Sequence, residues 1–510
     1  MEHGPLASIA ILGGGTAGWM TAAALARHYR GAGIAITLIE SSAIGTVGVG
    51  EATIPTLRPF YQSLGLSDAE VICATQATCK LGIAYHDWKA PGSSFIHPFG
   101  GFGHDYGGVG FQHYFNRWRR EFGLGPLDAY AMGSALARAG RFALPAPPPN
   151  AELYNHFDWA LHFDAALFAK LMRGVAEAAG VRRVDATLQG VRLRPEDGFI
   201  DALDLDTGES VRADLFIDCS GFNALLIGKA LGVGYEDYSD WLFCDRAVAV
   251  QSARAAAPRP LTEVSAQKAG WRWHIPLQHR SGNGHVFSSA HMSDDEAVAT
   301  LMAQLPGAAA GEPRVIRFRP GRREQAWAKN CIAIGLASGF LEPLESTSIA
   351  LIQTGIERVR QLLPATTGDW RALRDEHNDM ARREMERTRD FLILHYKLNR
   401  RGDTDFWRQA AAMDVPDTLA RKTALYRQRG HFVRYRWEMF HPVSWLAIYA
   451  GFDVWPETVD PAAANIPEAQ MRDIFTRLRA QIAASVERAQ PHAAFLDYCR
   501  RIAEKQHVPA

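Results

Sequence analysis

One glycine-rich segment near the start of the chain constrains its fold more than any other feature. An apolar run at 7–12 is followed by Gly13-Gly14-Gly15-Thr16-Ala17-Gly18, a helical stretch at 19–26 and a second apolar run at 34–40 that ends in Glu40. We interpret this order as strand, tight turn, helix and strand. Such glycines let the backbone N–H groups at the helix start approach a pyrophosphate, and Glu40 is placed to accept hydrogen bonds from ribose hydroxyls. The segment predicts dinucleotide binding; the alternative is a merely glycine-rich turn.

The rest of the chain favours FAD over NAD, because no second G-x-G-x-x-G segment follows a strand. Two later apolar runs, at 214–221 and 331–339, end in small residues. We expect both to return to the same sheet and to approach a flat cofactor closely. The alternative is a pair of buried strands with ordinary turns.

The composition excludes several classes of function. The 510 residues include 55 Lys and Arg against 55 Asp and Glu, which argues against nucleic acid or anionic lipid as a partner. No apolar run approaches the roughly 18 residues that a membrane helix needs, and we expect a soluble, cytoplasmic protein. The six cysteines form no C-x-x-C pair and the 18 histidines show no metal-binding spacing, so we expect neither a disulfide framework nor a metal site.

Several motifs resemble those of one enzyme family. They are G-G-G-T-A-G-W-M from Gly13, G-V-G-E-A-T-I-P within the loop 45–55, K-L-G-I from Lys80, W-R-W-H-I-P from Trp271 and L-E-P-L-E-S-T from Leu341. They occur in the order seen in flavin-dependent halogenases of the tryptophan halogenase family, and the resemblance runs from about residue 8 to beyond residue 450. Related flavin monooxygenases share the dinucleotide motif but lack W-x-W-x-I-P.

The resemblance implies an enzyme that uses reduced FAD, O2 and chloride or bromide to form hypohalous acid, which moves through an internal tunnel to an electron-rich aromatic ring. It implies Lys80 and Glu345 as catalytic residues and the backbone N–H groups of Thr347 and Ser348 as halide ligands. A single dinucleotide motif leaves no evident NAD(P)H site, so we expect a separate NAD(P)H-dependent flavin reductase as a partner. The expected FAD-binding residues are Gly13, Gly14, Gly15, Thr16, Ala17, Gly18, Glu40, Val49, Ala52, Leu188 and Leu336.

The types of the two catalytic residues suit this chemistry. Lys80 lies in a mostly apolar stretch, and burial would lower its pKa so that its amine can hydrogen-bond hypohalous acid or be halogenated by it. A carboxylate such as Glu345 stabilises the cationic intermediate of aromatic substitution and takes its proton. The alternatives are a surface lysine and a glutamate that begins a helix. Ser348 stands where several tryptophan halogenases have glycine, which leaves the preference between chloride and bromide open.

Free tryptophan is a less favoured substrate than a simpler indole or another electron-rich ring. Tryptophan halogenases hold the amino-acid part of tryptophan with a Tyr-Tyr pair and a nearby Glu, followed by a Phe-Trp pair, but the equivalent region 432–445 contains no Tyr-Tyr pair. The stacking residues are retained: the resemblance maps His97 and Phe99 onto a His-x-Phe element, and we expect them to line the substrate site together with Trp445. The alternative for these residues is a packed aromatic core.

The expected fold class is α/β, a Rossmann-like FAD-binding fold of the kind found in flavoprotein monooxygenases, with a mainly helical C-terminal subdomain. We expect a discontinuous FAD-binding domain at 1–365, with substrate-side insertions at about 91–149 and 236–309, and a helical subdomain at 366–510 that covers the substrate. The arginine-rich run 314–323 reads as a strand that enters a turn.

Two other functions stay open at this stage. One is an FAD-dependent aromatic monooxygenase that hydroxylates its substrate directly. The other is a flavoprotein that binds FAD as a sensor or scaffold without turnover. The sequence also leaves open whether the chain is a monomer or a homodimer.

Overall fold

The computed structural model describes residues 4–44, 50–145, 156–254 and 256–506. The glycine-rich segment begins a six-stranded sheet, and the predicted order of strand, turn, helix and strand is confirmed. The three elements are β1 (Ser8–Leu12), α1 (Thr16–His28) and β2 (Ala35–Glu40). All but one of the five strand pairings in this sheet are parallel, and the sheet has the order β21-β22-β13-β1-β2-β9.

Both later apolar runs join this sheet, as predicted. β13 (Leu215–Asp218) pairs with β1, and β22 (Cys331–Ala333) pairs with β13. After β22 the small residues that end the second run form a 3-10 turn at Gly335–Ala337. The edge strands are β9 (Arg182–Asp185) and the antiparallel β21 (Trp327–Ala328).

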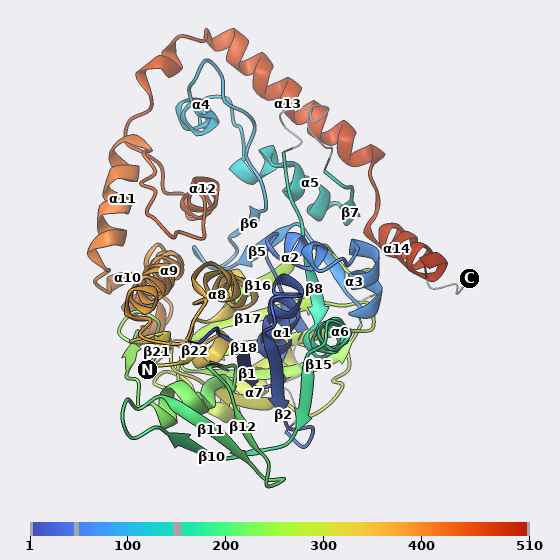
Figure 1. Ribbon diagram of the computed structural model, residues 1–510. Helices are drawn as coiled ribbons and strands as arrows, with labels where there is room; N and C mark the ends of the chain where they lie inside the picture. The colour runs from blue at the N-terminus through green and yellow to red at the C-terminus, as the bar shows by residue number, and fades with distance from the viewer. Residues whose placement is uncertain (1–3, 45–49, 146–155, 255, 507–510) are drawn as a thin grey trace.

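Three helices cover the parallel sheet next to the glycine-rich turn. α1 packs against α6 (Ala165–Ala178) and α8 (Ser348–Leu362), and Figure 1 shows the three side by side. Asp164 caps α6, accepting from the backbone N–H groups of Ala166 and Leu167. Because the central strands are buried on both faces, they read as continuous apolar runs rather than alternating ones.

A seven-stranded sheet lies beside the parallel one and is antiparallel except where β16 pairs with β5. Its central strand β17 contains the W-x-W-x-I-P segment, and its edge strand β19 is the arginine-rich strand predicted from the sequence. In sheet order the strands are β19 (Arg314–Arg317), β15 (Arg246–Ala253), β18 (Arg280–Phe287), β17 (Gly270–Pro276), β16 (Thr262–Gln267), β5 (Gly82–His86) and β6 (Ser94–Pro98).

The remaining strands form small antiparallel sheets. One brings β3 (Gly50–Ala52) and β4 (Thr78–Lys80) onto the two sides of β8 (Ala160–Asp164). The others are β10 (Leu188–Leu193), β11 (Ile200–Leu205) and β12 (Ser210–Arg212); β14 (Tyr235–Asp237), β20 (Gly321–Arg323) and β23 (Gly339–Phe340); and β7 (Arg141–Phe142) with β24 (Gln490–Pro491).

Beyond residue 366 the described elements are helical apart from β24, which agrees with the expected fold class. They are α9 (Arg371–Lys397), α10 (Asp405–Ala412), α11 (Asp417–Arg429), α12 (Pro442–Gly451), α13 (Glu468–Arg488) and α14 (His492–Gln506). Besides α1, the α-helices before α6 are α2 (Leu57–Ser63), α3 (Asp68–Ala74), α4 (Phe111–Trp118) and α5 (Met132–Arg138), and α7 (Asp294–Ala303) follows β18. None of the described helices combines the length and the apolar character needed to cross a bilayer.

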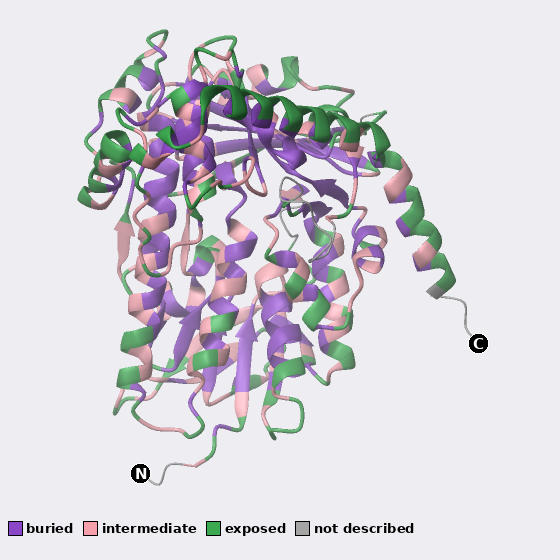
Figure 2. Ribbon diagram, turned by 90° about the horizontal axis from the view of Figure 1, so that it is seen from above, coloured by how far each residue is buried: buried purple, intermediate pink, exposed green. Residues whose placement is uncertain are grey.

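The C-terminal helices return to the N-terminal half. Figure 1 shows α13 arching over α4, α5 and α12, and Figure 2 shows it lying across the sheets with its outer face exposed. After it, β24 pairs with β7 and α14 packs on α3. Because the last segment shares contacts with residues before 150, a division of the chain near residue 365 remains a prediction.

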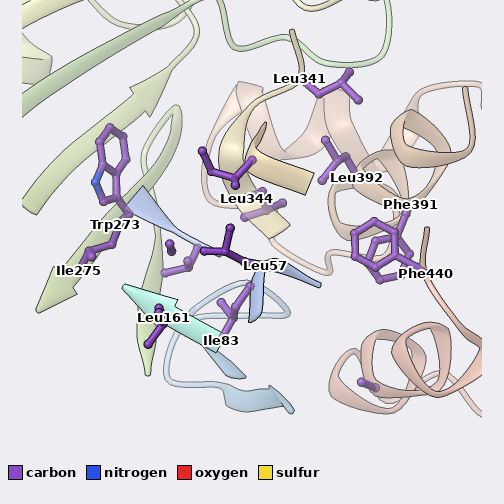
Figure 3. Packing of buried hydrophobic residues seen from close by; sticks show 14 of the residues in the cluster. Leu57, Ile83, Leu161, Trp273, Ile275, Leu341, Leu344, Phe391, Leu392 and Phe440 are labelled. Carbon is purple, nitrogen blue, oxygen red and sulfur yellow. The ribbon is translucent and has the colours of Figure 1, made fainter. Parts of the chain in front are cut away.

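A buried apolar cluster links the two halves where the motif L-E-P-L-E-S-T lies. Figure 3 shows Leu344 near the centre of the view, with Leu341 and Leu392 of α9 on one side and the strand residues Ile83 and Leu161 on the other. All five side chains are nearly inaccessible to solvent. The motif is therefore held by hydrophobic packing on one side, which fixes where its polar residues point.

The glycine-rich turn needs glycine at two positions in particular. Gly13 has φ +117°, and a Cβ there would lie 2.2 Å from the carbonyl oxygen of Cys219. A Cβ on Gly18, in the first turn of α1, would lie 1.8 Å from the carbonyl oxygen of Gly13. The helix can therefore pack this closely on the turn only when residue 18 has no side chain.

Gly18 and Gly174 form a matched pair for a stability measurement, because both are helical but only Gly18 is confined. Gly174 lies in α6 with no atom within 4 Å of a built Cβ. We expect Gly18→Ala to lower the free energy of unfolding by about 1–3 kcal/mol through overpacking. We expect Gly174→Ala to raise it by about 0.5–1 kcal/mol through helix propensity. Denaturant unfolding of both variants tests this; equal effects would refute the confinement of Gly18.

Candidate active site

The motif L-E-P-L-E-S-T forms a tight buried loop ahead of α8. Its residues Pro343–Glu345 make a 3-10 turn, and Ser346 follows with φ +59°, a left-handed conformation that is uncommon for serine. Thr347 is the N-cap residue of α8. The turn aims the Glu345 side chain into the interior, where it is 1% exposed.

Lys80 meets this loop from the end of β4. Its side chain is fully buried, and its Nζ donates to the carbonyl oxygen of Thr53 at 2.9 Å and to Oγ of Ser346 at 2.7 Å. The alternative of a surface lysine is therefore wrong. Burial lowers the pKa of Lys80 to about 7, and the negative charge of Glu345 opposes this shift only in part. Near neutral pH the amine is thus poised between its neutral and charged forms.

Three side chains from three elements surround the Glu345 carboxylate. Tyr85 of β5 donates its hydroxyl to Oε1 at 2.5 Å, and Nε2 of His395 on α9 lies 2.8 Å from the same oxygen. Nδ1 of His97 on β6 lies 2.9 Å from Oε2 and 3.0 Å from Oε1. Burial alone would raise the pKa of Glu345, but the charges and hydrogen bonds of His97 and His395 outweigh it and hold this pKa well below its usual range.

The first glutamate of the motif, Glu342, is buried in a different environment. Its Oε2 accepts from the indole N–H of Trp271 and from the hydroxyl of Tyr396, each at 2.7 Å. Its Oε1 is buried without a hydrogen-bond partner among the described residues. Burial raises the pKa of Glu342 to about 7, although the two donors act against it. The first Trp of W-x-W-x-I-P therefore anchors the loop through Glu342.

The predicted substrate residues lie around these two groups. Phe99 is half-buried, with its ring centroid 5.2 Å from Nζ of Lys80. Trp445 of α12 packs edge-on against Phe391 at 4.9 Å, and Phe391 also faces His97 at 6.1 Å. Figure 3 shows the ring of Phe391 stacked on Phe440, with a centroid separation of 3.9 Å. His97 thus contacts both Glu345 and the ring of Phe391. The sequence did not indicate its contact with Glu345.

The predicted halide residues stand at the start of α8. Thr347 is fully buried and Ser348 is the first residue of this 15-residue helix. The hydroxyl of Thr347 is buried and has no hydrogen-bond partner within the part of the chain that the structure describes. The free N–H groups of a helix N-terminus, together with its dipole, favour an anion.

The glycine-rich turn fits a dinucleotide. A Cβ on Gly15 would meet no atom within 4 Å, and α1 begins without a side-chain cap and without an acidic residue in its first turn. Open space and unpaired N–H groups are what a pyrophosphate requires. Glu40 ends β2 beside the turn, accepting from Nε of Arg183 at 2.6 Å and from Nε1 of Trp19 at 3.2 Å. These residues can hold FAD, so the cofactor fits the site.

The other predicted flavin residues lie on several elements. Leu336 is exposed in the 3-10 turn beyond β22, and a Cβ on the neighbouring Gly335 would lie 2.9 Å from Cβ of Ala17. Leu188 begins β10 directly after Thr187, whose hydroxyl reaches Ser41 at the end of β2. Ala52 is buried in β3, and Val49 lies outside the described residues. No cluster of three or more potential metal ligands occurs in the described ranges.

Sequence reasoning missed Tyr85, His395 and Ser346 as members of the site. Tyr85 belongs to a strand that is buried on both faces, so no alternation marks it. His395 and Tyr396 stand in the apolar stripe of α9, where two adjacent polar side chains among buried residues were an available signal.

Comparison with known proteins agrees with the motifs. The sequence profile of the tryptophan halogenase family matches residues 8–468. The tryptophan 6-halogenase SttH of Streptomyces toxytricini is 36% identical over 502 residues, covering 92% of this chain and 94% of that protein. The tryptophan 7-halogenase RebH of Lentzea aerocolonigenes is 33% identical, with 91% and 93% covered.

Solved structures show the same likeness. BrvH, a flavin-dependent halogenase from Brevundimonas sp. BAL3, superposes with a TM-score of 0.94 at 59% identity, covering 97% of this chain and 99% of that one. Xcc4156, a flavin-dependent halogenase from Xanthomonas campestris, has a TM-score of 0.92 at 43% identity, with 97% and 98% covered.

The raised pKa of Glu342 makes stability depend on pH. Between about pH 4.5 and pH 7 the unfolded chain loses this proton while the folded chain keeps it, so the contribution of Glu342 falls as the pH rises through this window. Glu342→Gln keeps the shape but does not titrate. We expect the free energy of unfolding of the wild type relative to Glu342→Gln to fall by about 3 kcal/mol from pH 4.5 to pH 7.5. Denaturant unfolding along this pH series measures it; a constant difference would contradict the raised pKa.

Proposed function

The chain belongs to the tryptophan halogenase family and is a flavin-dependent halogenase, and from this premise we propose that it halogenates an indole by electrophilic substitution, with Lys80 and Glu345 as its catalytic residues. One observation carries the assignment. The buried amine of Lys80 donates to Ser346, the residue next to the buried carboxylate of Glu345, so an electrophile held by the lysine lies beside a base. Chloride and bromide are both proposed as halides.

Each cofactor has residues that suit it. Gly13–Gly18 and Glu40 would hold FAD, and the N–H groups of Thr347 and Ser348 would hold the halide. When bound in reduced form, FAD with O2 supplies the oxidising equivalent that turns halide into hypohalous acid. We propose that the reduced FAD comes from a separate NAD(P)H-dependent reductase.

The substitution step transfers one halogen to the ring, one proton from Lys80 and one proton to Glu345. The bond between halogen and oxygen breaks, its electron pair stays on oxygen, and a proton from the charged form of Lys80 completes water. The ring carbon bonds to halogen, and its C–H proton passes to Glu345. A pKa near 7 lets Lys80 hold hypohalous acid as a neutral amine and also supply a proton.

The absence of a clamp for free tryptophan is supported by the charges in the region 432–445. Glu438, the glutamate in this region, forms an ion pair with Lys422, and both side chains are buried. Its other oxygen accepts from the backbone N–H of Tyr435 at 3.2 Å. A carboxylate that is already neutralised has little to offer a substrate ammonium. This favours an indole without an amino-acid group.

Product analysis tests the proposed function. The purified protein is supplied with FAD, a flavin reductase, NADH, O2 and bromide or chloride, and the products from indole are analysed by mass spectrometry. We expect a halogen isotope pattern that falls by about 100-fold or more in Lys80→Ala and in Glu345→Gln. Both variants should still bind FAD, because neither residue belongs to the glycine-rich turn. A hydroxylated product would favour the monooxygenase, and bound FAD without any product would favour a sensor or scaffold.

Substrate preference is tested by competition. With indole and tryptophan present together, we expect kcat/KM for indole to exceed that for tryptophan at least about tenfold, because no free carboxylate or Tyr-Tyr pair binds the amino-acid group. The ratio of the two halogenated products measures this directly. Equal or reversed preference would refute the argument from the Lys422 and Glu438 ion pair.

A further inference from the structure

The two oxygens of the Glu345 carboxylate have unequal numbers of contacts. Oε1 has contacts at 2.5 Å from Tyr85, 2.8 Å from His395 and 3.0 Å from His97. Oε2 has one contact in the described chain, at 2.9 Å from His97. The groups that face Glu345 are thus Tyr85, His97 and His395, together with the charge of Lys80.

The hydrogen-bond partners of His395 indicate which of its ring nitrogens carry a proton. Its Nδ1 lies 2.8 Å from the carbonyl oxygen of Phe391, which only accepts, so Nδ1 bears a proton. Its Nε2 lies 2.8 Å from Oε1 of Glu345, so one further proton lies between these two atoms. Because Oε1 also accepts from Tyr85, a proton placed on Oε1 would weaken that second hydrogen bond. The arrangement therefore favours His395 as the donor and the carboxylate of Glu345 as the acceptor of this hydrogen bond.

We propose, on the basis of the proposed function, that His395 is a positioning residue for Glu345: with Tyr85 it occupies Oε1 and leaves Oε2 as the atom that takes the ring proton. Nothing in the motif L-E-P-L-E-S-T itself specifies which oxygen acts. The choice comes from α9, a helix that begins 26 residues after Glu345.

The proton transfer is balanced at named atoms. The C–H bond of the halogenated ring breaks, its electron pair restores the aromatic system, and its proton bonds to Oε2. His395 keeps its proton and continues to donate to Oε1. His97 lies at nearly equal distances from the two oxygens, so it can keep its hydrogen bond to Oε1 while Oε2 is protonated.

The packing around His395 makes this role specific. The imidazole is fully buried, with the ring of Phe391 edge-on at 5.1 Å and the ring of Tyr85 at 5.3 Å. His377 offers a matched control on the same helix. It is also buried, but neither of its ring nitrogens has a hydrogen-bond partner in the described ranges, and its ring faces Trp327 at 5.6 Å.

The test compares His395→Phe, His395→Gln and His377→Phe under excess reductase. His395→Phe removes the donor, so burial acts on Glu345 with less opposition and its pKa rises. We expect the acidic limb of kcat to move to higher pH, kcat at pH 7 to fall about tenfold or more and KM for indole to change little. With ring-deuterated indole, the isotope effect on kcat should increase because proton removal becomes slower. Gln keeps an N–H donor without the charge, so a smaller shift is expected.

Tyr85→Phe keeps the test decisive if His395→Phe does not fold. It removes one hydroxyl from the same oxygen and should move the pH limb and the isotope effect in the same direction. His377→Phe should leave both unchanged. Loss of kcat at every pH with an unchanged isotope effect, or no change in either variant of His395, would overturn the inference. If the wild type makes no halogenated indole, the proposed function itself has failed, which is a separate outcome.

Discussion

Two buried carboxyl groups, three residues apart, determine how the rest of this structure is arranged. An unpaired carboxylate in the interior costs several kcal/mol, so each must be supplied with donors. The donors for Glu345 come from β5, β6 and α9, and those for Glu342 come from β17 and α9. The seven-stranded sheet and helix α9 therefore have to meet at this loop. Leu341 and Leu344 provide the apolar side of the same arrangement.

Two adjacent residues of α9 each contact a different one of the two glutamates. His395 contacts Glu345 and Tyr396 contacts Glu342. The consequences are opposite: the pKa of Glu345 is lowered and that of Glu342 is raised to about 7. A histidine can carry a charge that stabilises a carboxylate, whereas tyrosine and tryptophan offer only neutral donors. One loop thus holds a permanent anion, suited to be the proposed base, beside a group that can stay neutral and anchor the backbone.

Local signals made the fold predictable, and long-range contacts limited what could be predicted of the site. The strand–turn–helix–strand order at residues 8–40 and the mainly helical character of the chain beyond residue 366 are encoded by neighbouring residues, and both are confirmed. Lys80 and Glu345 were found through motifs. Tyr85 and His395 were not, because their role depends on a contact with a loop about 260 and 50 residues away. The pairing of Lys422 with Glu438 likewise needs the fold of α11 to be known.

The hydrogen-bond acceptors around Lys80 favour the neutral form of its amine. A neutral amine has two N–H groups and one lone pair, and the two acceptors within reach are the carbonyl oxygen of Thr53 and Oγ of Ser346. Both N–H groups are then satisfied and the lone pair stays free. An ammonium would instead leave its third N–H without a partner among the described residues, which is costly in a buried site unless hypohalous acid accepts from it. The left-handed backbone at Ser346 places the hydroxyl that completes this set. In the proposed function, the strained residue beside the base therefore helps to keep the lysine neutral and able to accept a hydrogen bond from hypohalous acid.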